Sequence, residues 1–256
     1  TFLNSAFFLK MASFIFEPLK KLEKFANDCI RLFACYVILM IATTAVQYTP
    51  FELIDVFLFG HEPLPIPDII DWTRSHDLLF KKLIWLYNSL NEALVIVPCL
   101  FILLRQSNKI NDFCHFLVLT CIIGFGFYFF FPSCGPVHLF DKVHFSQAQA
   151  NNYQKYFEIH HGLLPVSDHG GMIACPSFHV IWAWSCTRIF ISYRRLFPFA
   201  LTWFIGIVVS TILLGWHYSI DVIIALLIIS CYEVYSRWAL KHAPYGLTNW
   251  QNKLFT

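Results

Sequence analysis

Two histidines and one aspartate have the spacing that acid–base chemistry needs. His217 and Asp221 are four residues apart, so on a helix they share a face and the carboxylate can orient or charge-stabilise the imidazole. His179 follows Pro176 and Ser177, a pair typical of a helix start. Because these residues border long apolar runs, where an unpartnered carboxylate is costly, a partner or a task is expected for Asp221.

This set of residues suits phosphoryl transfer. The free first-turn amides of a helix that begins near Pro176, together with the Ser177 hydroxyl, can hold phosphate oxygens. His217, oriented by Asp221, can attack phosphorus and form a phosphohistidine. His179 can protonate the leaving oxygen and then deprotonate the acceptor. The scheme needs no metal or cofactor, and the sequence offers no carboxylate cluster for Mg²⁺.

The same residues also have plainer interpretations. His217 and Asp221 can form a structural pair at a helix start, and Ser177 can be a helix cap alone. Tyr87 and Asn88 are candidate pocket residues, but they can equally be hydrogen-bonding contacts between helices. Five histidines between residues 137 and 174 are spaced too irregularly for a metal site and are better read as solvated: His138, His144, His160, His161 and His169.

The composition predicts an integral membrane protein. Of the 256 residues 57% are hydrophobic and 13% are charged, whereas soluble domains carry about 25% charged residues. The basic residues are scattered, which argues against a nucleic-acid partner. We therefore expect membrane lipids as substrates, with the oligomeric state left open.

The fold class expected is an all-α bundle of six transmembrane helices preceded by an interfacial amphipathic helix. Residues 137–174 are too polar to cross the membrane and are expected to lie in a loop at 133–175. The predicted domains are an interfacial segment at 1–28, a catalytic membrane domain at 29–240 and a cytoplasmic tail at 241–256. The six spans are expected at 32–48, 83–104, 113–131, 176–193, 196–214 and 219–235.

The distribution of positive charge predicts the orientation. With a cytoplasmic N-terminus and six spans, most of the 18 Lys and Arg fall on the cytoplasmic side. Both termini are then cytoplasmic. His179, His217 and the 133–175 loop converge on the extracytoplasmic side, periplasmic or lumenal. Cys134 and Cys175 share that side, where a disulfide between them is one of two open alternatives.

Two stretches resemble signatures of a known family. Cys175-Pro176-Ser177-Phe178-His179 and Gly215-Trp216-His217-Tyr218-Ser219-Ile220-Asp221 are similar to the second and third signatures of the type 2 phosphatidic acid phosphatase superfamily. The closer match is its inositol phosphorylceramide synthase-like branch, supported by Tyr87-Asn88-Ser89 and by the run from Phe131 to Pro136. The resemblance covers residues 83–235. It implies His217 as nucleophile, Asp221 as its partner and His179 as acid/base.

The sequence departs from the broader family pattern at its cations. The Lys and Arg-Pro of the first signature have no equivalent near residues 83–136, and Thr211 stands where the third signature has Arg. Lys142, His138 or the Gly170-Gly171 backbone are possible substitutes as phosphate ligands. Because the phosphotransferase-like branch often lacks these basic residues too, the departure weakens the phosphatase label more than the mechanism.

Two rival functions stay open. One is a catalytically silent membrane protein of the same fold that binds lipid. The other is a transporter, which the polar Asn91 and Glu92 within a predicted span suggest. Substrate flux that does not depend on His217 would favour the transporter.

Overall fold

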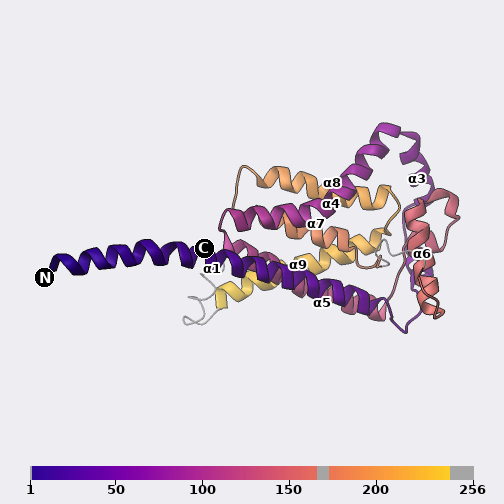
Figure 1. The fold of residues 1–256 in the computed structure, drawn as a ribbon. Helices are drawn as coiled ribbons and strands as arrows, with labels where there is room; N and C mark the ends of the chain where they lie inside the picture. The colour runs from indigo at the N-terminus through magenta and orange to yellow at the C-terminus, as the bar shows by residue number, and fades with distance from the viewer. Residues whose placement is uncertain (1, 166–172, 243–256) are drawn as a thin grey trace.

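Helices form all the regular secondary structure in residues 2–165 and 173–242, which are the residues that this computed structural model describes; the side chains of residues 2–20 and 240 lie outside that description. The all-α prediction is confirmed for these residues. The long helices run side by side, and shorter helices gather at one end of the bundle (Figure 1). The bundle consists of α1 (Phe2–Val46), α4 (Asp77–Leu103), α5 (Ser107–Phe130), α7 (Phe178–Arg188), α8 (Phe197–Leu213) and α9 (Ser219–His242); at its end lie α2 (Asp55–Gly60), α3 (Ile66–Ser75), η1 (Pro136–His138), η2 (Lys142–His144) and α6 (Gln147–His160).

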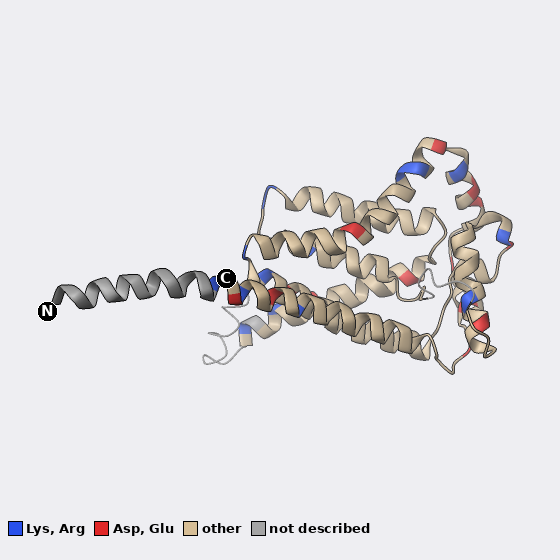
Figure 2. Ribbon diagram, in the orientation of Figure 1, with Lys and Arg blue, Asp and Glu red and all other residues tan. Residues whose placement is uncertain are grey.

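Four helices are long and apolar enough to cross a membrane. The stretches Lys21–Val46, Asp77–Leu103, Ser107–Phe130 and Ser219–Ala239 meet this condition, and they match four of the predicted spans. Charged residues lie mainly at the two ends of the bundle (Figure 2). The other two predicted spans are shorter helices: α8 has 17 residues and α7 has 11. Six spans therefore stay a prediction.

Helix α7 is short because it lies inside the protein. Its 11 residues extend about 16 Å, and it packs against α4, α5, α8 and α9. At its far end the buried Arg188 forms ion pairs with Asp112 of α5 and Glu233 of α9. These contacts hold α7, whose first turn carries His179, among the other helices of the bundle.

The two ends of the chain and the polar loop differ from their predicted outlines. Helix α1 continues without a break from Phe2 to Val46, so no change of element marks residue 28. Most of the predicted tail, from residue 243 onward, lies outside the described residues. The predicted loop contains helix α6, which begins with a capping box between Ser146 and Gln149.

Candidate active site

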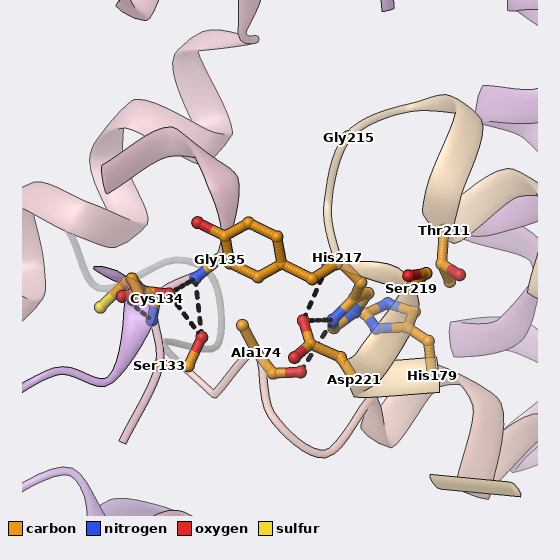
Figure 3. A network of polar contacts seen from close by, with 12 residues as sticks. Ser133, Cys134, Gly135, Ala174, His179, Thr211, Gly215, His217, Ser219 and Asp221 are labelled. Carbon is orange, nitrogen blue, oxygen red and sulfur yellow. Dashed lines mark hydrogen bonds and ion pairs between the residues drawn. The ribbon is translucent and has the colours of Figure 1, made fainter. Parts of the chain in front are cut away.

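His217 is held by two acceptors through one ring nitrogen. Its Nδ1 lies 2.8 Å from the carbonyl oxygen of Ala174 and 3.5 Å from Oδ2 of Asp221 (Figure 3). A carbonyl can only accept, so Nδ1 carries the hydrogen and Nε2 of the neutral ring presents a lone pair. Nε2 makes no hydrogen bond to any described residue. His217 is 3% exposed, so its environment selects one tautomer and leaves Nε2 without a partner among the described residues.

A glycine turn brings His217 into this position. Helix α8 ends at Leu213, and Gly215 follows with a φ of +71°, the left-handed conformation common after a helix C-terminus. The amide of Trp216 donates to the carbonyl of Thr211 and closes the turn. A Cβ at Gly215 would lie 2.3 Å from Cδ1 of Ile70, so a side chain here would also have to displace Ile70 of α3.

Asp221 joins the two helices that carry the histidines. It is fully buried, and its Oδ2 accepts a hydrogen bond from the amide of Tyr218 at 2.9 Å. Its backbone carbonyl accepts from the amide of Ser177, one residue before α7 begins. A single residue of α9 therefore sets the start of α7 relative to His217.

His179 lies in the first turn of α7 and faces His217. The two imidazole centroids are 6.0 Å apart. Tyr87 of α4 stacks on His179 with centroids 4.1 Å apart, and its hydroxyl lies 3.3 Å from Nδ1 of His179. Tyr87 also stacks on Trp216. These contacts leave Nε2 of His179 without a hydrogen-bond partner among the described residues.

Both histidines open into one cavity of about 540 Å³. The predicted pocket residues Tyr87 and Asn88 line it, and so does Trp216. Its lining has no Lys or Arg among the described residues. Four carboxamide side chains line it without a hydrogen bond to any described residue: Gln47, Asn88, Asn91 and Asn152. The cavity thus combines two imidazoles with neutral hydrogen-bonding groups, a lining suited to a polar head group.

Two of the predicted phosphate ligands, Ser177 and Lys142, do not line this cavity. The Ser177 hydroxyl is fully buried and makes no hydrogen bond to any residue that the structure describes. Lys142 is exposed, with its amine 5.6 Å from the centre of the Tyr153 ring. Gly171 lies outside the described residues. Thr211, in place of the family's Arg, donates its hydroxyl hydrogen to the carbonyl of Val208.

A buried carboxylate that the sequence did not single out supports the loop after α5. Asp55 of α2 accepts hydrogen bonds from the Ser133 hydroxyl at 2.6 Å and from the amides of Cys134 and Gly135, both at 3.1 Å. The carbonyl of Ser133 then accepts from the amide of Ala174. Asp55 therefore supports, through the loop, the carbonyl that orients His217.

Two further residues, from the segments at the end of the bundle where α2 and α6 lie, hold the turn that carries His217. Glu62 accepts hydrogen bonds from both the amide and the hydroxyl of Ser219, at the first residue of α9. Gln149 of α6 donates to the carbonyls of Leu214 and Gly215. The capping box Ser146-x-x-Gln149 is the one sequence signal that points to this end of α6.

Cys134 and Cys175 are both buried, free thiols, so the structure does not pair them. Burial raises the pKa of Cys175, and the charge of Asp221 raises it further. The thiol is therefore protonated at neutral pH and is a poor nucleophile beside His217. Among the described residues, no three His, Cys, Asp or Glu side chains gather as metal ligands.

A family model described as the PAP2 superfamily matches residues 63–232, about two thirds of the chain. The matched range includes α4, α5, α7, α8 and most of α9, and with them His179, His217 and Asp221. No curated protein and no solved structure matches the chain significantly.

Proposed function

The chain belongs to the PAP2 superfamily, and on this premise we propose that it transfers phosphoryl groups of lipid phosphate esters through a phosphohistidine at His217. Lipid phosphatase or phosphotransferase activity is what the family suggests. The observation that carries the proposal is the tautomer of His217. Nδ1 donates its hydrogen to the carbonyl of Ala174, so Nε2 keeps its lone pair available to a ligand in the cavity that His217 lines.

The proposed reaction has two steps. Nε2 of His217 attacks phosphorus, the bond from phosphorus to the lipid oxygen breaks, and His179 gives its proton to that oxygen. Asp221, 3.5 Å from Nδ1, stabilises the positive charge that develops on the ring. In the second step His179 removes a proton from water or an alcohol, whose oxygen attacks the phosphohistidine and regenerates His217.

We further infer that the acceptor is an alcohol, as in the inositol phosphorylceramide synthase-like branch. The carboxamides of Asn88, Asn91 and Asn152 make no hydrogen bond to any described residue and can both donate to and accept from hydroxyls, which favours a polyol head group on the transferred phosphate, as in that branch. The proposed site faces the extracytoplasmic side of a six-span protein.

Product analysis tests the proposal. Purified protein is incubated in vesicles that contain phosphatidylinositol, phosphatidic acid, ceramide and diacylglycerol, and the lipids are identified by mass spectrometry. A new phosphodiester that is absent with His217→Ala supports the transferase. Release of inorganic phosphate alone indicates a phosphatase. If the lipid profile is the same for wild type and His217→Ala, the proposed function is wrong.

A further inference from the structure

A second hollow joins the catalytic cavity on the side of α1. It has a volume of about 380 Å³ and shares Thr43, Gln47 and Trp182 with the cavity. The two hollows therefore adjoin, with these three side chains at their common boundary. We call the second hollow the α1 groove.

The walls of the α1 groove suit hydrocarbon. From Tyr36 to Gln47 it follows a stretch of α1 about 16 Å long. Met40, at 64% exposure, lies inside the candidate span Lys21–Val46, so the groove opens toward the membrane. The remaining apolar lining comes from Leu39 of α1, Leu94 of α4, Leu117 of α5 and Trp182 of α7.

A cation lies in the lining of the groove. Lys155 of α6 is half-buried there and makes no ion pair with any described residue. Asn152, three residues earlier on the same helix, lines the catalytic cavity. Lys155 therefore lies where the groove approaches the cavity, and a half-buried cation without a carboxylate has charge available for an anionic ligand.

We propose that the α1 groove binds the acyl chain of a phosphate-bearing membrane lipid, and that Lys155 binds the phosphate of that lipid. This inference rests on the proposed function, because it identifies the lipid as the substrate whose phosphate reaches His217. Lys155 then supplies the positive charge that the described lining of the catalytic cavity lacks. The order of groups along α1 fits a lipid, with hydrocarbon toward the membrane interior and phosphate toward α6.

Photolabelling tests the groove independently of turnover. The probe is phosphatidic acid with a diazirine in the middle of one acyl chain, in phosphatidylcholine vesicles, and the protein is the full chain with His217→Ala. We expect the label on the groove-facing side of residues 36–47. Thr44 is an exposed residue that lines the groove. Thr44→Trp should fill the groove at this point, displace the acyl chain and reduce labelling about tenfold. Met40→Trp repeats the test should Thr44→Trp fail to fold.

The matched controls separate the groove from a general lipid contact. Ile41→Trp is exposed on the same helix but does not line the groove, so labelling should be unchanged. Lys155→Gln should weaken competition by unlabelled phosphatidic acid about fivefold, as expected for one exchanged ion pair. Lys155→Gln should not change competition by diacylglycerol, which has no phosphate. Lys82→Gln should not change competition by either lipid.

Equal labelling in Thr44→Trp and Ile41→Trp would overturn the groove, and unchanged competition in Lys155→Gln would overturn the role of the lysine. Phosphoryl transfer by the wild-type protein is measured in parallel. Groove labelling without any transfer would contradict the proposed function and leave the binding site standing. Transfer without groove labelling would contradict only this inference.

Discussion

His217 donates its Nδ1 hydrogen to the backbone carbonyl of Ala174 across 2.8 Å. The nearby carboxylate of Asp221 is farther from the same nitrogen, at 3.5 Å. A backbone carbonyl thus selects the tautomer, and the aspartate contributes mainly charge. In a site where the carboxylate alone orients the histidine, its loss would also free the ring. Here the loss of the charge of Asp221 should leave the orientation of His217 intact.

Asp221→Asn should lower kcat about 100-fold and leave KM nearly unchanged. The Asn oxygen can still accept from the amide of Tyr218, and Ala174 still holds the imidazole, so the main loss is the negative charge that stabilises the imidazolium. Steady-state kinetics on a lipid substrate measure the effect, with thermal unfolding as the control for folding. A variant as active as wild type would show that the charge of Asp221 is not used.

His179→Ala should affect substrates according to their leaving group. We expect a loss of about 100-fold or more with a lipid phosphate, whose alkoxide needs a proton in order to leave. With para-nitrophenyl phosphate the loss in forming the phosphoenzyme should be far smaller, since nitrophenolate leaves without a proton. Rapid-quench measurement of the first turnover distinguishes the two. Equal losses with both substrates would contradict the assignment of His179 as general acid.

Gly135→Ala should destabilise the protein and reduce its activity. Gly135 has a φ of +83°, and a Cβ there would lie 2.8 Å from the carbonyl oxygen of Trp216, next to His217. The backbone strain alone costs about 1 kcal/mol or more. Gly126→Ala is the matched control, because a Cβ there meets nothing within 4 Å. Thermal unfolding in detergent should show a lower Tm for Gly135→Ala only. Equal Tm values for the two variants would contradict the requirement for glycine at position 135.

Asp55→Asn should destabilise the protein by about 2–3 kcal/mol and lower kcat. The Asn side chain would place an NH2 group where a carboxylate oxygen now accepts from the 133–135 loop. The loop would then move, and with it Ala174, whose amide donates to the carbonyl of Ser133. Asp71→Asn removes a carboxylate from a pair with His144 and is the control, because that aspartate is half exposed and its pair is worth little. If both variants retain wild-type kcat, Asp55 does not support the site.

The sequence was sufficient to predict the helical class, four long apolar helices and the grouping of His179 with His217 and Asp221. These depend on local patterns: apolar run length, a Pro-Ser helix start and a four-residue spacing. The capping contacts depend instead on how distant segments fold back. Glu62 and Ser219, for example, are 157 residues apart, and no periodicity links them. The length of α7 was also overestimated, because hydropathy alone does not distinguish a helix buried in protein from one that faces lipid.

Isolation of the phosphoenzyme tests the central claim most directly. The wild-type protein and His217→Ala are incubated with lipid that carries labelled phosphate, quenched under alkaline conditions, digested and analysed by mass spectrometry. We predict an acid-labile, base-stable phosphate on the peptide that contains His217 in the wild-type protein, and none in His217→Ala. Equal labelling of both proteins, or turnover by the wild type without any labelled histidine, would contradict the account.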